Sequence, residues 1–487
     1  MNRQRIGLIL AATIGLLLAG CAVGPDFKPP AAPTTHDYTP EPVVLPSAGV
    51  GDVQQNLKLG ATVTAEWWKL FESPTLDRTL TLAIADSPTL DAARATLAQA
   101  QEAVRAAAGG LYPQVDLGAS ASRSRAALID ADHGSRVENL FSVGPLVSYN
   151  ADVFGGTLRL VEQQSALADF QNYQLGAAYL SLSGNAVTQA INIAAAREQL
   201  AATDAIIKAD QQNLELVRLS VQAGKGAPAD LLSAESQLAS DQALVPPLQQ
   251  QLSAARDALS VLVGKAASEW QPPEFDFTSL TLPTDLPVTV PSQLVHARPD
   301  ILAAEAQLHA ASATIGIATA NLYPSISLTA SWAQQATTTA ALFDASNGLW
   351  SVAANLTAPI FHGGTLRAQE RAAEDAFSAQ LATYRQTVLT SFQQVADVLQ
   401  ALDHDAQLVR AQQYALDTAT ASLRLAQDSY AAGAGSFLQV LVAQRIYGQA
   451  RLGYANAKGQ RYLDTAQLFV AMGGGWQTAE PTVSSNR

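Results

Sequence analysis

The sequence contains one cysteine, few aromatic residues and no excess of positive charge. The six histidines show no metal-ligand spacing, so we expect no metal site and no cofactor. Aromatic residues make up 6% of a chain that is 48% hydrophobic, which indicates alanine and leucine seams rather than a bulky core. A net charge of -13 argues against a nucleic-acid partner, because phosphate binding requires a basic face.

The chain also lacks the motifs of common enzymes. It has no Walker-type phosphate loop, and Gly155-Gly156 and Gly363-Gly364 do not have Rossmann spacing. The serines and aspartates of the predicted strands have no histidine partner that would suggest a nucleophile. We therefore expect no catalytic residue and no enzymatic activity.

The longest apolar run lies at the N-terminus. Arg3 and Arg5 precede a run from Ile6 to Leu18, and Leu18-Ala19-Gly20-Cys21 then supplies small residues, as at the cleavage site of a secretory signal. After residue 20, no stretch approaches the roughly 18 apolar residues of a membrane-spanning helix. The sequence therefore predicts an exported protein without such a helix.

Two very long helices are predicted, over residues 157–222 and 365–432. In the first, apolar positions step by seven from Tyr179 to Val221, and the same seam recurs about 209 residues later from Val388 to Tyr430. Each helix would measure roughly 100 Å at 1.5 Å per residue. Such a rod suits spanning a gap better than lining a pocket.

Short peptides around these helices are repeated. Gly155 to Arg159 reads Gly-Gly-Thr-Leu-Arg and recurs at Gly363 to Arg367, and Leu111-Tyr112-Pro113 recurs at Leu322-Tyr323-Pro324. We interpret this as a duplication of about 210 residues, well above the length of solenoid repeats. The alternative is two unrelated alanine-rich helices.

After each Tyr-Pro the hydrophobic period changes to two, which predicts strands at about 114–124, 142–153, 325–334 and 349–360. Their length suits tilted strands that cross a bilayer, although a soluble amphipathic hairpin would show the same alternation. Four strands cannot close a barrel alone, and an open edge cannot be left in lipid. The barrel must therefore be shared: a dimer is the minimum and a trimer would give twelve strands.

The predicted organisation has six parts. They are a signal peptide (1–20), a lipidated, proline-rich extended arm (21–65), a first repeat (66–270), a bridge (271–295), a second repeat (296–476) and a tail (477–487). Besides the two long helices, the first repeat is expected to hold helices at about 88–111 and 228–263, and the second at about 299–322 and 437–472. Pro246-Pro247 is expected to bend the helix at 228–263.

The signal sequence ends in a motif that resembles a bacterial lipobox. This resemblance implies cleavage before Cys21 and attachment of lipid to that residue. Ala22 follows in place of the Asp that retains many lipoproteins in the inner membrane, so we expect anchoring in the outer membrane. The alternative is a mature chain with one incidental thiol.

The chain resembles the outer membrane efflux proteins of the TolC-like family, and among them the NodT-type lipoproteins. Residues that carry the resemblance include Cys21 to Phe27, Trp67-Trp68, Asp152 to Gly155, Arg298 to Ile301 and Gly473 to Trp476. It implies a mixed α and β membrane protein, in which strands from a homotrimer form a twelve-stranded barrel in outer membrane lipid. Antiparallel coiled-coil helices would form a periplasmic tunnel docked on a periplasmic membrane-fusion adaptor protein and an inner-membrane transporter of the RND type.

The resemblance also implies a gate at the periplasmic tip. A Leu and an Asp one turn apart narrow the opening in relatives, and the matching positions here are Leu423 and Gln427, with the Asp displaced to Asp428. Whether Asp428 and Arg424 together form a substitute polar ring stays open. The alternative is that Leu423 is only a seam residue and Asp428 a solvated charge.

Two glycine-containing turns are expected adaptor contacts, with plain helix-connecting turns as the alternative. Their residues are Gly224, Lys225, Gly226, Gly433, Gly435 and Ser436. The function implied is a passive exit duct that passes small molecules such as drugs from a tripartite efflux pump to the outside. The alternatives are the outlet of a protein secretion system and a lipid-anchored coiled-coil scaffold without a pore.

Overall fold

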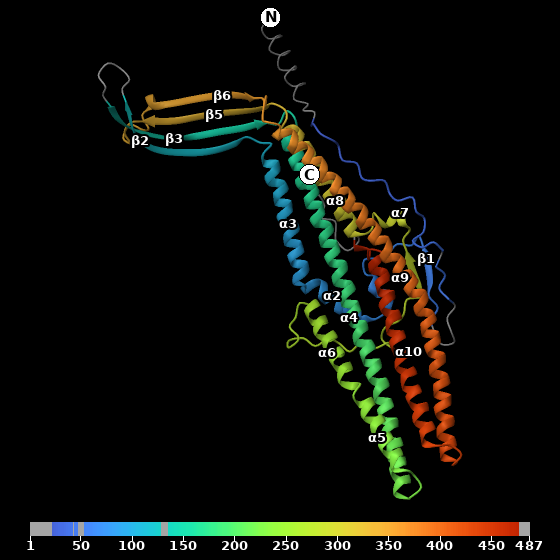
Figure 1. Ribbon diagram of the computed structural model, residues 1–487. Coiled ribbons are helices and arrows are strands. Elements are labelled where there is room, and N and C mark those ends of the chain that lie inside the picture. The colour runs from blue at the N-terminus through green and yellow to red at the C-terminus, as the bar shows by residue number, and fades with distance from the viewer. Residues whose placement is uncertain (1–21, 42, 47–52, 128–134, 477–487) are drawn as a thin grey trace. The chain divides into compact units, whose positions relative to one another are not determined.

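The structure is a computed structural model that describes residues 22–41, 43–46, 53–127 and 135–476 (Figure 1). The chain divides into two compact units. The first, which we call the strand unit, comprises Ala95–Asn172, Ala303–Arg385 and the described residues up to Pro30. The second, the helical unit, comprises Ala31–Arg94, Tyr173–Leu302 and the described residues from Gln386 onward.

Four antiparallel strands form the sheet of the strand unit. They are β2 (Gln114–Ala127), β3 (Ser135–Ala151), β5 (Ser325–Ala336) and β6 (Gly348–Thr357), in the order β2-β3-β5-β6. Figure 1 shows the four strands side by side. Each repeat thus supplies one hairpin to a single sheet.

Two of the strand boundaries differ from the prediction. β3 begins at Ser135 rather than near residue 142, because residues 135–141 pair with the far end of β2. Asn139 on the apolar face and Leu140 on the polar face break the alternation there, which hid the pairing from the sequence pattern. β6 ends at Thr357 rather than near residue 360, since Pro359 has no N–H to donate to a ladder.

Two helices of 67 residues each start where a hairpin ends. They are α4 (Gly156–Gln222) and α9 (Thr365–Ala431). Gly155 and Gly364, just before them, have φ of 76° and 86°, a backbone conformation that favours glycine. The predicted seam is buried at positions such as Ile193 in α4 and Val395 in α9.

The remaining helices are shorter. They are α2 (Pro74–Asp86), α3 (Pro88–Gly109), α5 (Pro228–Gln242), α6 (Val245–Leu262), α7 (Pro291–Leu294), α8 (Pro299–Ala320) and α10 (Phe437–Ala471), with 3-10 turns η1 (Trp67–Phe71) and η2 (Ala345–Asn347). The helix expected over 228–263 is two helices, because Pro246-Pro247 occupies the first turn of α6 and starts a new helix there. A short parallel pair, β1 (Asn56–Leu59) and β4 (Asp285–Val288), completes the helical unit.

The expectation of alanine and leucine seams without a bulky core was wrong for the helical unit. Trp67, Trp68 and Phe71 are at most 1% exposed, and the ring of Trp67 lies 5.3 Å from that of Phe469. The aromatic residues are few, but several of them are buried together in this cluster.

Among the described residues, one helix has the length and composition of a membrane span, contrary to our expectation. α8 has a window of mean hydropathy 1.2, and half of that window is buried within the protein. Alanine supplies much of this hydropathy, and the helix contains no unbroken run of large apolar residues.

Candidate functional site

The register of the sheet places apolar side chains on one face. Val115, Val147, Ala330 and Val352 are successive partners across the four strands. The same face carries Leu117, Phe141, Val143, Tyr149, Leu328, Trp332, Trp350 and Leu356. Val115 is 68% exposed and Val352 is 73% exposed, so this face suits contact with lipid.

The opposite face carries small polar side chains. They include Asp116, Ser120, Ser122, Ser142, Ser148, Asn150, Ser325, Ser327, Thr329, Ser331, Ser351, Asn355 and Thr357. Ser331 and Ser351 share a hydrogen bond of 2.8 Å across β5 and β6. Leu140, Leu146 and Leu349 are large apolar exceptions on this face. A sheet with one lipid-type and one water-type face matches the wall of a water-filled barrel.

The sheet has two open edges. β2 pairs only with β3, and β6 only with β5, within the described chain. Unpaired backbone groups are costly in hydrocarbon, where water cannot satisfy them. The four strands therefore require further strands beyond these edges when the sheet is in a membrane.

The two predicted adaptor-contact turns have the same backbone geometry. In the first, the N–H groups of Lys225 and Gly226 donate to the Ser220 carbonyl at 2.9 and 3.1 Å. In the second, Ala434 and Gly435 donate to the Ser429 carbonyl at the same two distances. The duplication thus extends to the hydrogen bonds of the turns.

The turns differ in how the following helix begins. Ser436 caps α10 through a reciprocal pair of hydrogen bonds with Gln439, whereas Ala227 gives α5 no side-chain cap. Gly224 and Gly433 adopt φ of 71° and 72°, and a Cβ built on either would meet nothing within 4 Å. Both turns are therefore open surfaces at the ends of helical hairpins.

The predicted gate residues lie near the end of α9. Leu423 is half-buried and packs against the cluster that contains Val217, Phe437 and Val440. Arg424, Gln427 and Asp428 are exposed. Neither Arg424 nor Asp428 forms an ion pair with another described residue, so within one chain the polar side chains are accessible and Leu423 belongs to the seam.

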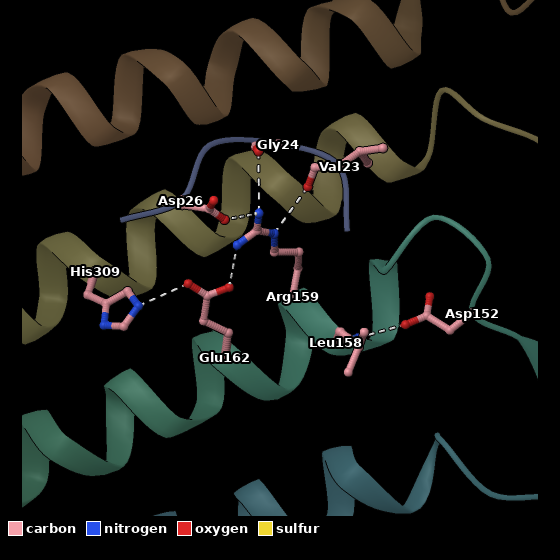
Figure 2. Close-up of polar contacts among 8 residues, drawn as sticks. All are labelled: Val23, Gly24, Asp26, Asp152, Leu158, Arg159, Glu162 and His309. Atoms are coloured by element: carbon pink, nitrogen blue, oxygen red, sulfur yellow. Dashed lines mark hydrogen bonds and ion pairs between the residues drawn. The ribbon is translucent and has the colours of Figure 1, made fainter. Parts of the chain in front are cut away.

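A polar site that the sequence analysis did not identify surrounds Arg159 in the strand unit (Figure 2). Arg159 is 5% exposed. Its guanidinium donates to the carbonyls of Val23 and Gly24 at 3.1 and 3.3 Å, and to the carboxylates of Asp26 and Glu162 at 2.9 and 2.7 Å. These contacts hold the residues that follow Cys21, which itself lies outside the described residues.

Glu162 connects this site to α8. Its second carboxylate oxygen lies 3.0 Å from Nε2 of His309 (Figure 2), and the His309 ring stacks on Phe27 with centroids 4.4 Å apart. The N-terminus of α4 is capped nearby, since Asp152 accepts hydrogen bonds from the backbone of Thr157 and Leu158. The strand-to-helix junction is thus tied to the N-terminal arm.

Two buried carboxyl pairs join the long helices to their returning partners in the helical unit. Asp210 of α4 lies beside Asp241 of α5 and accepts a hydrogen bond from Gln444 of α10. Burial, together with Asp241, raises the pKa of Asp210 to about 8. Burial, together with Asp464 of α10, likewise raises the pKa of Asp405 to about 8.

Among the described residues, no group of three or more His, Cys, Asp or Glu side chains could hold a metal ion.

Comparison with known proteins identifies the family. The model of the outer membrane efflux protein family matches residues 79–265 and 290–474, one segment for each repeat. Pyoverdine export outer membrane protein OpmQ of Pseudomonas aeruginosa is 32% identical over 98% of this chain and 98% of its own. Toluene efflux pump outer membrane protein TtgI of Pseudomonas putida is 30% identical over 96% of this chain and 97% of its own.

The fold matches solved outer-membrane channels as well. The outer-membrane channel OprN has a TM-score of 0.85 at 26% identity, over 94% of this chain and 100% of its own. The predicted fold class, internal duplication, outer-membrane location and role as an efflux exit duct are thereby confirmed. The family is one of transport channels rather than enzymes. This chain belongs to the outer membrane efflux protein family.

Proposed function

We propose that the protein acts as a homotrimer that receives small toxic molecules from a periplasmic membrane-fusion adaptor protein and an inner-membrane transporter of the RND type. The observation that carries this proposal is the four-stranded sheet with one apolar face, one polar face and two open edges. Three copies would supply twelve strands and leave no edge in the lipid. With no nucleotide motif in the sequence, the energy for transport comes from the inner-membrane partner.

The lumen face favours passage over binding. Its side chains are mainly short hydroxyl and amide groups, which form hydrogen bonds with water and give few large apolar contacts to a solute. The relatives carry names as different as pyoverdine export and toluene efflux. A duct for varied small molecules, drugs among them, fits this wall better than a site for one ligand.

The lipid anchor on Cys21 belongs to the same proposal. Cys21 lies outside the described residues, but Ala22 lies directly against Gly155, because a Cβ built on Gly155 would be 2.6 Å from the Ala22 Cα. Gly155 ends the turn between β3 and α4. An acyl chain on Cys21 would therefore start beside the end of the membrane-spanning strands.

The tip residues receive two proposed roles. Arg424, Gln427 and Asp428 are exposed on α9 next to the seam residue Leu423, where they can meet their counterparts from other copies around the tunnel axis. We infer that these four residues narrow the resting opening. The two turns, at Gly224 to Gly226 and Gly433 to Ser436, present matching open surfaces that suit an adaptor contact.

The proposal is tested by deleting the gene and complementing it on a plasmid. We expect the deletion strain to accumulate more of a small fluorescent efflux substrate and to become more susceptible to drugs, with its secreted proteins unchanged. A changed set of secreted proteins together with unchanged susceptibility would instead favour a protein secretion outlet.

A further inference from the structure

The first residues after Cys21 occupy a site that is built to receive them. We propose that Arg159, Glu162 and His309 form a docking site whose ligand is the chain's own segment Ala22–Phe27. Docking, rather than the length of the arm, then fixes the N-terminus beside the β3 to α4 junction. The consequence for membrane anchoring rests on the proposed lipid on Cys21, whereas the docking itself does not.

The polar contacts recognise both the main chain and one side chain of the segment. The Arg159 guanidinium donates to two carbonyls, those of Val23 and Gly24, and to the Asp26 carboxylate. The Val23 N–H donates to the Phe154 carbonyl at 3.1 Å, which adds a main-chain contact on the other side. Arg159 is 5% exposed, so loss of these partners would leave a buried cation with only Glu162 to balance it.

The shape of the site depends on glycine. A Cβ built on Gly24 would lie 2.5 Å from the Gly316 Cα, and one built on Gly316 would lie 2.8 Å from the Arg159 Cδ. Neither position has room for a side chain. The arm therefore contacts the backbone of α8 at Gly316. The aliphatic part of the Arg159 side chain packs against the same glycine.

The segment ends in an aromatic contact. The Phe27 ring stacks on His309 at an interplanar angle of 12°. His309 is held from its other side by Glu162, which also binds Arg159. Arg159, Glu162 and His309 thus form one connected set of side chains from α4 and α8 (Figure 2), and this set contacts the segment from Val23 to Phe27.

The duplication provides an internal comparison. Arg367 and Glu370 stand at the start of α9 as Arg159 and Glu162 stand at the start of α4, after the same Gly-Gly-Thr-Leu peptide. The Arg367 side chain is 74% exposed and lies 3.9 Å from Glu370. The same local sequence is therefore buried where the arm docks and exposed where no arm is present, so starting a long helix does not by itself require a buried arginine.

The test compares three variants of the full-length protein in detergent: Arg159→Lys, Asp26→Asn and the matched control Arg367→Lys. Chymotrypsin cleaves after Phe27 only when that segment leaves its site. We expect cleavage about tenfold faster in Arg159→Lys, because an ammonium cannot reach all the partners of the guanidinium. In Asp26→Asn the amide oxygen still accepts from Arg159 but the ion pair is lost, so we expect a smaller increase, since the Asp26 side chain is 88% exposed. Cleavage in Arg367→Lys should match the wild type.

Arg159→Lys could speed cleavage simply by disturbing the helices. Asp26→Asn controls for this, because residue 26 lies in the arm and its substitution leaves the helices intact, which circular dichroism verifies. Equal cleavage rates in Asp26→Asn, Arg159→Lys and Arg367→Lys would overturn the docking site. If the wild-type protein resists chymotrypsin at Phe27 but transports no efflux substrate, the proposed function is wrong and the docking site is still supported. The mass of the released peptide, residues 21–27, reports the lipid on Cys21 separately.

Discussion

At the scale of single residues, the helical unit contains carboxyl groups that water does not reach. Asp210 is 4% exposed, and its Oδ2 accepts no hydrogen bond from any donor in the described part of the chain. Oδ2 of Asp405 is likewise buried and accepts no hydrogen bond from a described donor. Burial disfavours the ionised form of Asp210 and of Asp405, and a proton shared with Asp241 in one case and with Asp464 in the other satisfies these oxygens. Both effects raise the pKa of Asp210 and of Asp405.

These pairs predict a pH dependence of stability. The folded pKa of about 8 lies above the ordinary value of 3.8, so the stabilisation is fully present below pH 3.8 and is lost as the pH rises through 8. We expect the thermal midpoint of the wild type to fall by several degrees between pH 5.5 and 8.5, by about 1 °C for each kcal/mol lost in a chain of 487 residues.

The Asp210→Asn, Asp405→Asn double variant checks this prediction by circular dichroism at the two pH values. An amide keeps the side-chain volume and cannot ionise, so the variant should lose much less stability at pH 8.5. The control is Asp428→Asn, which is exposed and should behave as the wild type does. Equal losses in the double variant and the wild type would refute the assignment.

Single residues also show where sequence reasoning stops. Arg159 and Arg367 follow identical Gly-Gly-Thr-Leu peptides, yet their side chains are 6% and 74% exposed. What distinguishes them is the arm, whose residues lie 133 to 136 positions away from Arg159 in the sequence. No local pattern carries that information. The contact of Asp210 with Gln444 likewise joins residues 234 apart in the sequence.

At the scale of elements, hydrophobic periodicity located each helix or strand that buries one of its faces or turns one toward lipid. The heptad located both 67-residue helices, since a seam repeated over many turns has few competing interpretations. Alternation located the strands and the two faces of the sheet, but missed the charged start of β3. The prolines at 246 and 247 were recognised as an interruption, although their role as the first turn of α6 was not.

The packing of β3 on β5 gives an element-scale prediction. A Cβ built on Gly144 would lie 2.0 Å from the Trp332 carbonyl oxygen, whereas one on its partner Gly118 would come no nearer than 4.0 Å to Gly144. Gly144→Ala should therefore separate β3 from β5 and prevent assembly, and Gly118→Ala should not. The fraction of chain that reaches the outer membrane as a three-copy species on native gels measures this, with equal fractions contradicting the close contact.

At the scale of the whole molecule, the duplication explains how one chain supplies two hairpins and two rods. Each half carries Tyr-Pro, a strand pair and a Gly-Gly start, so the sequence predicted the repeat without knowledge of any contact. The number of copies followed instead from the family resemblance. Four strands per chain imply a barrel shared between chains, but they fit an eight-stranded dimer as well as a twelve-stranded trimer. At the periplasmic tip the sequence predicted the two turns, whereas the exposure of Arg424 and Asp428 is visible only in the structure.

The central claim is that the assembled chain is a water-filled duct narrowed at its periplasmic end. Single-channel conductance in planar bilayers tests it most directly, with the wild type compared with a Leu423→Ala, Asp428→Ala double variant. We predict discrete conductance steps for the wild type, and larger or more frequent steps for the variant, because both substitutions remove side chains from the tip. Steps unchanged in the variant would contradict the gate, and two folded preparations that conduct no current would contradict the duct.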